Sequence, residues 1–465
     1  MGSLSSPHVV IFPFLSQGHI IPILYLSRLL RRRSVVVTLF TTAGNSPGIR
    51  ESLQDTDVSI IELPFPQSID GVPQGVENTQ KLSFESSFVP FARATEQMQA
   101  SFEKSLETLQ PAVSCIVSDS FLWWTLKSAQ KIGIPRLGFF GMGNFSATMY
   151  QILGRFKPHA GTDSVDEPFS MTYFPEIELT RNDFDPPFGD INPSGPYVDF
   201  LTDCIIALAM SNGLIVNSFY ELEPRYVDFW NKNLGPKTWN IGPLCLAAPP
   251  PEINRSKNAS CHLQWLDEKL ERGEPVLYVS FGTQAELSPE QFLAIAEGLE
   301  KSGVSFLWAV RPKDLDFLPE FESRVKGRGI VAKEWVDQMK ILQHEGVKGF
   351  LSHCGWNSVM ESISAGVPIL AMPFVAEQHL NARFVAEEIG AGLRIMPRGG
   401  SVRGYVAAEE VERKVRELMV GGKVAKEVNK RVAEWCGAAC AAVKEGGSSW
   451  RTLDSLIDTV AGNLN

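Results

Sequence analysis

Short apolar runs rich in β-branched residues alternate with stretches of helical periodicity along most of this chain, and this alternation limits the possible folds more than any other feature. In the first half, the spacing predicts helices within residues 20–32 and 84–109. The predicted buried strands lie at residues 8–14, 35–41, 58–63, 113–118 and 136–140. Because parallel strands are joined by crossover segments, usually helices, the pattern predicts an α/β fold with parallel sheets and helices on both faces.

The alternation stops near residues 239–251, where Pro, Gly and Ala dominate, and this composition is typical of a linker. The 465 residues exceed what one hydrophobic core usually holds. We therefore predict an N-terminal domain over residues 1–240, a linker over 241–260 and a second α/β domain from residue 261. Within the second domain, Ser288, Pro289 and Gln291 predict a helix start closed by a capping box. The predicted strands lie at residues 276–281, 306–310, 329–332, 347–352 and 368–372.

Charge and cysteine content exclude several classes of protein. The chain has 43 Lys and Arg against 53 Asp and Glu, and this net negative charge is the wrong sign for binding nucleic acid or an anionic membrane surface. The 7 cysteines are scattered and include no CxxC pair, which favours a reducing, cytoplasmic location over a disulfide or zinc framework. The N-terminus lacks the basic region of a signal peptide, and no apolar run reaches the ~18 residues of a membrane span.

Two domains of this kind are expected to face each other across a cleft, because open parallel sheets bind ligands at the carboxyl ends of their strands. The sequence has no GxGxxG fingerprint, which counts against a nicotinamide-dependent oxidoreductase. It also lacks GxSxG and HExxH segments, which counts against two classes of hydrolase. The residues that follow the strands are therefore the place to look for function.

One strand end in the second half has the character of an anion site. The predicted strand at 347–352 is followed by a turn at Cys354 and Gly355, and a helix begins near Trp356. The free N–H groups and the positive end of that helix would attract a diphosphate. Asn357 and Ser358, taken alone, would be ordinary N-caps. The polar side chains expected to meet the diphosphate are His353, Asn357 and Ser358, with Ser280 and Thr283 after a neighbouring strand.

The most specific segment of the chain spans residues 335–378 and reads WVDQMKILQHEGVKGFLSHCGWNSVMESISAGVPILAMPFVAEQ. Along its entire length it resembles the signature of plant secondary-product UDP-sugar glycosyltransferases. The segments GIPRLGFF, GLIVNSFYELE, CHLQWLDE and EGGSSWRTL extend the resemblance over nearly the whole chain. It implies the GT-B fold of two facing Rossmann-like domains, an acceptor-binding N-terminal domain and a UDP-sugar-binding domain over residues 261–447. A last helix at 448–465 would pack back on the N-terminal domain.

The resemblance also implies roles for single residues of this signature segment. Trp335 would stack on the uracil ring, and the backbone of Val336 and Gln338 would meet the edge of the base; the alternative for Trp335 is a buried core position. Glu361 would accept both ribose hydroxyls, and its alternative is a solvated helix face. Gly355 would belong to the same diphosphate turn.

The end of the signature segment is implied to bind the sugar. Glu377 and Gln378 would form hydrogen bonds with its hydroxyls, close to the backbone of Trp356, and a terminal Gln usually accompanies glucose in this family. Two departures affect sugar selectivity. Val336 and Asp337 stand where the family has Ala-Pro, which removes the stiffness of a proline, and Glu377 replaces an Asp.

The first half supplies a candidate general base. His19 follows the first predicted strand and Gly18, which is itself a candidate contact for the UDP-sugar. Asp119 ends another strand, so His19 and Asp119 should lie at one edge of the sheet, where the carboxylate would orient the imidazole. The segment FPFLSQGHIIP resembles the FPxxxQGHxxP pattern of the same family, in which the matching His is the base. A lone His would more often be structural.

The acceptor pocket is expected in the N-terminal loops, which offer aromatic side chains suited to a flat ligand. The alternative is that half of them belong to the core. The candidates are Phe14, Phe84, Phe88, Phe121, Trp123, Phe140, Phe145 and Phe188.

These interpretations predict an inverting, metal-independent UDP-glucose-dependent glucosyltransferase acting on a small hydrophobic aromatic acceptor such as a flavonoid or other phenolic. UDP-glucose serves as co-substrate, and no cofactor is expected. The enzyme is expected to be a monomer. Three alternatives stay open: transfer to an aromatic carbon that gives a C-glucoside, a nucleotide-sugar-binding protein without turnover, and an oxidoreductase on a similar sheet.

Overall fold

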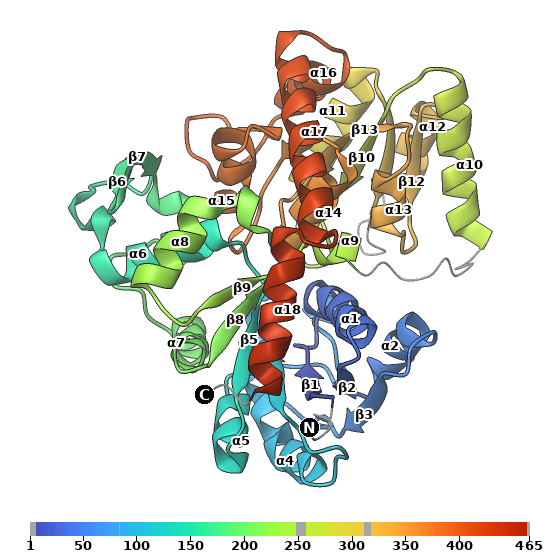
Figure 1. Ribbon diagram of the computed structural model, residues 1–465. Helices are drawn as coiled ribbons and strands as arrows, with labels where there is room; N and C mark the ends of the chain where they lie inside the picture. Colours follow the sequence, from blue (N-terminus) through green and yellow to red (C-terminus); the bar gives the residue numbers. More distant parts are fainter. Residues whose placement is uncertain (1–5, 83, 248–256, 311–317, 463–465) are drawn as a thin grey trace. The chain divides into compact units, whose positions relative to one another are not determined.

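The computed structural model describes residues 6–82, 84–247, 257–310 and 318–462. The chain divides into two units. The first comprises Met1–Asn144, Pro193–Glu252 and Ala441–Asn465, and the second comprises Phe145–Asn192 and Ile253–Cys440. Each unit is built on its own parallel sheet, so the predicted α/β class with two Rossmann-like domains is confirmed (Figure 1). Within the described ranges, no helix is both long and apolar enough to cross a membrane.

The sheet of the first unit has seven strands in the order β3-β2-β1-β4-β5-β8-β9, and every neighbouring pair is parallel. The order reverses direction between β1 and β4, which places the two carboxyl ends side by side at the usual ligand-binding point of such sheets. The strands are β1 (His8–Phe12), β2 (Val36–Thr42), β3 (Ser59–Leu63), β4 (Cys115–Asp119), β5 (Arg136–Phe140), β8 (Gly213–Val216) and β9 (Thr238–Asn240).

Side chains of β1 alternate between two apolar cores, one on each face of this sheet. Val9 and Ile11 belong to one core, and Val10 and Phe12 belong to the other, which is rich in aromatic rings. This double burial explains why the strands read as continuous apolar runs in the sequence. The helices of the unit are α1 (Gln17–Arg32), α2 (Ser46–Leu53), α3 (Phe84–Ala94), α4 (Gln99–Leu106), α5 (Thr125–Ile132), α7 (Pro196–Ala209), α8 (Pro224–Asn233), α9 (Leu244–Ala247) and α18 (Ser448–Ala461).

The C-terminal helix α18 packs into the first unit. Leu453 and Leu456 are buried in the same core as β1 and α1. The Ser449 hydroxyl donates to the carbonyl of Gly242 at 2.5 Å. Arg33, directly after α1, pairs with a carboxylate of this helix at Asp454 and lies over one of its aromatic rings. The end of the chain is thus part of the first unit rather than of the second.

The sheet of the second unit has six parallel strands in the order β12-β11-β10-β13-β14-β15. The strand order changes direction between β10 and β13, where Ser280 and Ser352 are paired. The strands are β10 (Val276–Ser280), β11 (Ser305–Ala309), β12 (Gly329–Ala332), β13 (Val347–Ser352), β14 (Ile369–Ala371) and β15 (Gly392–Arg394). The helices are α10 (Lys257–Glu271), α11 (Pro289–Ser302), α12 (Leu318–Arg324), α13 (Gln338–Leu342), α14 (Trp356–Ala365), α15 (Gln378–Arg383), α16 (Ala408–Met419) and α17 (Lys423–Val443). The last residues of α17, from Ala441, are assigned to the first unit.

Residues 145–192 belong to the second unit, whereas the sequence interpretation placed them in a continuous N-terminal domain over 1–240. This segment contains most of α6 (Asn144–Phe156) and an antiparallel pair, β6 (Phe169–Met171) and β7 (Phe174–Leu179), that joins neither parallel sheet. Its contacts explain the assignment. The Phe145 ring stacks on Phe384 with centroids 5.3 Å apart, and Asp183 forms an ion pair with Arg383 at 2.6 Å.

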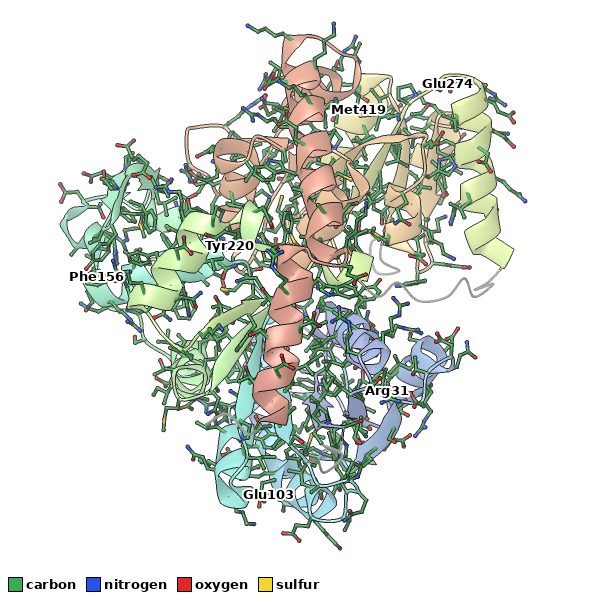
Figure 2. The ribbon with its side chains drawn as sticks, viewed as in Figure 1. Arg31, Glu103, Phe156, Tyr220, Glu274 and Met419 are labelled. Atoms are coloured by element: carbon green, nitrogen blue, oxygen red, sulfur yellow. The ribbon has the colours of Figure 1, made fainter. Side chains whose placement is uncertain are left out.

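The structure also bears on the predicted linker and on the predicted capping box. The predicted linker at 241–260 lies partly outside the described residues, and α10 already begins at Lys257. The hydroxyl of Ser288 caps α11 by accepting from the Gln291 amide, as expected. The side chain of Gln291, however, does not close a capping box, because it exchanges two hydrogen bonds with the backbone of Val406. Glu103 of α4, labelled in Figure 2, forms an ion pair with Lys131 of α5 at 2.6 Å.

Candidate active site

The first unit brings His19 and Asp119 into direct contact. β1 ends at Phe12 and α1 starts at Gln17, so His19 lies in the first turn of a helix at the carboxyl edge of the sheet. Asp119 is the last residue of the neighbouring strand β4. Its Oδ2 lies 2.7 Å from Nδ1 of His19. The His19 side chain is 22% exposed and that of Asp119 is 0% exposed, so the carboxylate is buried and the imidazole is partly accessible.

The Asp119 carboxylate is held in place by the turn that follows it. Its Oδ1 accepts a hydrogen bond from the backbone amide of Phe121 at 2.9 Å. The buried Arg136 guanidinium donates to the Asp119 carbonyl at 3.3 Å. With Asp119 as acceptor for the Nδ1 proton, Nε2 of His19 is the nitrogen that can take up a proton from a ligand. The pair therefore has the arrangement of a general base and its orienting acid.

Aromatic side chains surround this pair on the same unit. The Phe14 and Phe121 rings lie 5.4 and 5.1 Å from the His19 ring. Phe88 lies 6.0 Å from Phe14 and 5.9 Å from Phe121. Phe14, Phe88 and Trp123 are buried, so they also serve as core residues, whereas Phe121 is half-buried. We call Phe14, Phe88 and Phe121 the aromatic cluster.

Four aromatic candidates remain. Phe140 of the first unit contacts Trp230, at 6.2 Å between centroids. Phe145 and Phe188 belong to the second unit. The side chain of Phe84 lies outside the described residues. Sequence reasoning missed Phe200 of α7, whose ring lies 5.5 Å from Phe121 and 5.6 Å from Trp123, although the apolar pattern of its helix was the available signal.

In the second unit, the turn after β13 encloses His353 between two glycines. A Cβ atom at Gly282 would lie 2.7 Å from Nε2 of His353, and one at Gly355 would lie 2.6 Å from it, so neither position accepts a side chain without movement. Cys354 adopts a left-handed φ of 63°, and its amide donates to Ser352 Oγ. α14 begins at Trp356, as the sequence indicated, and its N-cap is Gly355 rather than Asn357 or Ser358. The imidazole is thus fixed beside the start of a helix.

Burial lowers the pKa of His353 to about 4. The imidazole is therefore neutral at physiological pH and can contribute hydrogen bonds but no positive charge. The positive end of α14 would attract an anion at this turn. Around it, Ser280 and Ser358 are buried, Asn357 is half-buried and Thr283 is exposed.

Trp335 is an exposed tryptophan, with 63% of its surface accessible, so the alternative of a buried core position is wrong. It follows β12 and precedes α13. Asp337, at one of the two departures from the family pattern, caps α13 by accepting from the Lys340 amide at 3.3 Å. This cap restrains the loop where the family has a proline.

The Gln338 side chain joins α13 to α14. Its Nε2 donates to Glu361 Oε2 at 2.7 Å and to Ser358 Oγ at 2.9 Å, and its Oε1 accepts from the Tyr278 hydroxyl at 3.3 Å. Glu361 is therefore held by a neighbouring helix rather than lying on a solvated face. Burial raises the pKa of Glu361 to about 7, although the Gln338 hydrogen bond opposes this shift.

Glu377 and Gln378 lie at the start of α15. The Gln378 side-chain oxygen accepts from the backbone amides of Phe374 and Val375 at 3.0 and 3.1 Å. Only its NH₂ group is then suited to a ligand, because the oxygen is already used by the loop. Glu377 accepts from Asn381, which also donates to the Cys354 carbonyl. This hydrogen bonding links the loop of Glu377 to the turn of His353.

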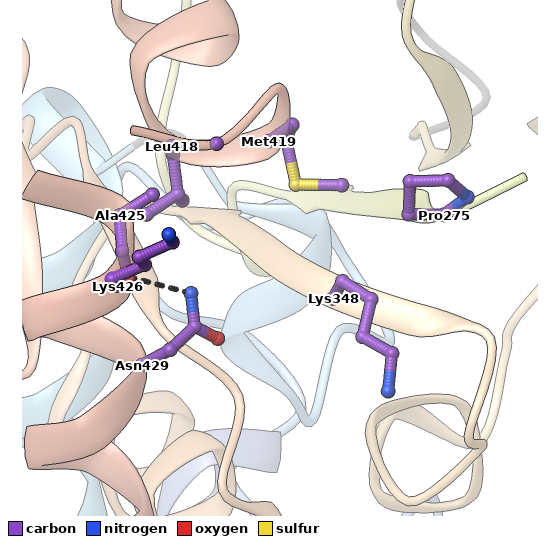
Figure 3. Close-up of a pocket in the computed structure, with 8 residues that line it drawn as sticks. Pro275, Lys348, Leu418, Met419, Ala425, Lys426 and Asn429 are labelled. Carbon is purple, nitrogen blue, oxygen red and sulfur yellow. Dashed lines mark hydrogen bonds between the residues drawn. The ribbon is translucent and has the colours of Figure 1, made fainter. Parts of the chain in front are cut away.

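A cavity of about 390 Å³ lies elsewhere in the second unit (Figure 3). It is lined by Pro275, which precedes β10, by Lys348 near the start of β13, and by Met419 and Lys426. The amino ends of the strands therefore border it. It includes none of the candidate site residues, which follow the carboxyl ends.

Residues 254–414 match the sequence pattern of the family described as "UDP-glucoronosyl and UDP-glucosyl transferase". UDP-glycosyltransferase 90A1 of Arabidopsis thaliana is 48% identical over 97% of this chain and 95% of its own. UDP-glucose flavonoid 3-O-glucosyltransferase 7 of Fragaria ananassa is 35% identical over 98% of this chain and 96% of its own. Among solved structures, Glycyrrhiza uralensis UGT73P12 complexed with glycyrrhetinic acid 3-O-monoglucuronide has a TM-score of 0.88 and 29% identity, with 98% of this chain and 96% of that chain covered.

Proposed function

The chain belongs to the plant UDP-glycosyltransferase family, and from this premise we propose that it transfers glucose from UDP-glucose to a hydroxyl of a small hydrophobic aromatic acceptor. The observation that carries the proposal is the hydrogen bond of 2.7 Å between His19 and Asp119 at the carboxyl edge of the first sheet. A hydroxyl must lose its proton as it attacks the sugar, and an imidazole oriented by a buried carboxylate is suited to accept that proton.

In the proposed reaction, Nε2 of His19 takes the proton of the acceptor hydroxyl. The oxygen forms a bond to the anomeric carbon as the bond from that carbon to the diphosphate breaks, and the bonding pair leaves with UDP. Attack in line with the departing group inverts the anomeric centre and gives a β-glucoside. The imidazolium that forms is stabilised by Asp119, which is shielded from water.

The donor would be held by residues of the second unit. We propose that Trp335 stacks on uracil, the backbone of Val336 and Gln338 meets the base edge, and Glu361 accepts the ribose hydroxyls. The diphosphate would lie at the turn of His353, Gly355 and the first residues of α14. Exposure of Trp335, the restraint on Glu361 and the helix end at Gly355 support this assignment.

We propose that the reaction needs no metal ion. The charge of the leaving UDP would be stabilised by the N-terminus of α14 and by hydrogen bonds from neighbouring side chains, with His353 neutral. Turnover is then expected to survive exhaustive dialysis against EDTA. Activity that is lost on chelation and restored by Mg²⁺ or Mn²⁺ would reject this part of the proposal.

The aromatic cluster lies beside the proposed base and supports an aromatic acceptor. Aromatic rings contact flat aromatic ligands over a large apolar area, and Phe121 keeps part of its surface open. The relative from Fragaria ananassa is named for a flavonoid acceptor, which fits this lining. A flavonoid or another phenolic is therefore the proposed substrate.

The test incubates the protein with UDP-glucose and a panel of phenolics and compares it with His19→Ala. The substitution should lower turnover by roughly 10²- to 10⁴-fold while leaving UDP binding nearly intact. His344→Ala is the matched control, because His344 forms a second His–Asp pair, with Asp267 at 3.0 Å, in the other unit. Turnover that is unchanged in His19→Ala would reject the base.

The same experiment separates the alternatives. UDP-glucose binding without any product would favour a nucleotide-sugar-binding protein. A product that resists acid hydrolysis would indicate a C-glucoside, since His19 could equally deprotonate a phenol next to an electron-rich ring carbon.

We also propose that the enzyme is a cytosolic monomer. All seven cysteines are free thiols, which suits a reducing compartment. Light scattering during size exclusion would test the monomer, and a fluorescent fusion would test the location.

A further inference from the structure

Asp185 contacts the loop that leads to Glu377 and Gln378, although the two regions are far apart in the sequence. Its Oδ1 accepts a hydrogen bond from the backbone amide of Ala376 at 2.9 Å. Both residues belong to the second unit. The Asp185 side chain is buried, so this contact is sheltered from water. A hydrogen bond from a neutral amide to a buried carboxylate is stronger than one between neutral groups.

The residue that receives this contact has an unusual backbone conformation. Ala376 has a φ of 55°, in the left-handed region that residues with a Cβ atom rarely occupy. Such a conformation persists only where surrounding contacts hold it. The Asp185 carboxylate provides one such contact on the amide of Ala376. Because Ala376 directly precedes Glu377, its conformation sets the direction in which the chain enters α15.

Asp185 is itself fixed by two neighbouring groups. Its backbone amide donates to the Tyr150 hydroxyl at 3.0 Å. Arg403 lies 3.9 Å from its Oδ1 and donates to the carbonyls of Asn182 and Phe184 at 2.8 and 3.0 Å. Tyr150 and Arg403 therefore hold the backbone around Asp185, and Arg403 also places a positive charge near its carboxylate.

Arg403 also contacts the loop that contains Ala376. It donates to the Phe374 carbonyl at 3.3 Å, two residues before Ala376. Within that loop, the Gln378 side-chain oxygen accepts from the amides of Phe374 and Val375. The segment from 374 to 378 is thus held by hydrogen bonds to Asp185, Arg403 and Gln378.

We propose that Asp185 is a positioning residue for the donor sugar, which holds residues 374–378 so that Glu377 and Gln378 meet the sugar hydroxyls. This inference rests on the proposed function, in which that pair binds the sugar of UDP-glucose. Asp185 acts through Ala376 and makes no contact with substrate. Its effect is therefore confined to the sugar and does not extend to the uracil, ribose or diphosphate.

The test compares Asp185→Ala with Asp185→Asn. The alanine variant should raise the KM for UDP-glucose roughly tenfold or more, because a hydrogen bond to a charged group is lost. Its Kd for UDP alone should stay within about twofold of the wild type, since UDP lacks the sugar. The asparagine variant keeps an oxygen that can accept from Ala376, and it should recover most of the affinity. The preference for UDP-glucose over UDP-galactose should fall in the alanine variant and recover in the asparagine variant.

Asp190→Asn is the matched control, because Asp190 lies in the same segment and forms an exposed ion pair with Arg181. It should leave both KM and donor preference unchanged. If Asp185→Ala does not fold, Asp185→Glu takes its place, since it keeps the charge but shifts the carboxylate by one methylene and should raise the KM in the same way.

Equal losses of affinity for UDP and UDP-glucose would show a general structural role and overturn the inference. An unchanged KM in both the alanine and glutamate variants would also overturn it. A wild-type protein that fails to bind UDP-glucose would instead reject the proposed function, so the two failures are distinguishable.

Discussion

The side-chain amide of Gln338 donates to the carboxylate of Glu361, with 2.7 Å between Nε2 and Oε2. The two residues come from different helices, α13 and α14. Burial raises the pKa of Glu361 to about 7, while the Gln338 amide favours the ionised form. The carboxylate proposed to bind ribose is therefore close to half-protonated near neutral pH, and its neighbour influences the balance.

Affinity for UDP should rise with pH through the pKa of Glu361. Below about 7 the carboxyl is protonated and can accept fewer hydrogen bonds, whereas above it the carboxylate can accept both ribose hydroxyls. Calorimetric Kd values for UDP between pH 6 and 8 would measure this. In Glu361→Gln the pH dependence should shrink to that of UDP itself, and a profile identical to the wild type would contradict the assignment.

Replacing Gln338 by methionine should weaken UDP binding by roughly 3- to 10-fold, because the carboxylate loses the donor that orients it. It should also move the midpoint of the pH profile upward, since the lost hydrogen bond stabilised the ionised form of Glu361. Binding of 2′-deoxy-UDP should fall less. Gln343→Met, at an exposed glutamine directly after α13, is the control and should change neither quantity.

Asp119→Asn should lower kcat by roughly 10²- to 10⁴-fold with little change in the Kd for UDP. The amide keeps the shape of the carboxylate but neither fixes the tautomer of His19 nor stabilises its charged form. Single-turnover rates would measure the effect. Asp267→Asn, which alters the His344 pair instead, should turn over at the wild-type rate. Wild-type turnover in Asp119→Asn would show that His19 needs no orienting acid.

The sequence was sufficient to predict the two parallel sheets because strands such as β1, β4 and β10 are buried on both faces. Val9 and Ile11 enter one core and Val10 and Phe12 the other, so the strand is apolar throughout and is recognisable without its neighbours. The same logic placed His19 and Asp119 at one edge, since both follow the carboxyl ends of parallel strands. These are local patterns combined with one general rule of sheet topology.

Contacts between segments far apart in the sequence could not be predicted from such local patterns. Asp183 pairs with Arg383 and Asp185 contacts Ala376, but nothing near either aspartate in the sequence indicates to which unit it belongs. For the same reason residues 145–192 were assigned to the first domain. Gln291 satisfied the local capping pattern, yet its side chain bonds to Val406, because a distant backbone offered both a donor and an acceptor.

Trp335→Ala should weaken UDP binding by about 5- to 100-fold, the range expected for losing one stacked base. It should barely change the Tm, because 63% of the Trp335 surface is exposed and little packing is lost. Calorimetry with UDP and thermal unfolding without ligand would give the two quantities. Trp335→Phe retains an aromatic face and should recover part of the affinity. Equal UDP binding in the alanine variant and the wild type would exclude Trp335 from the uracil site, whereas a large drop in Tm would show that its role is structural.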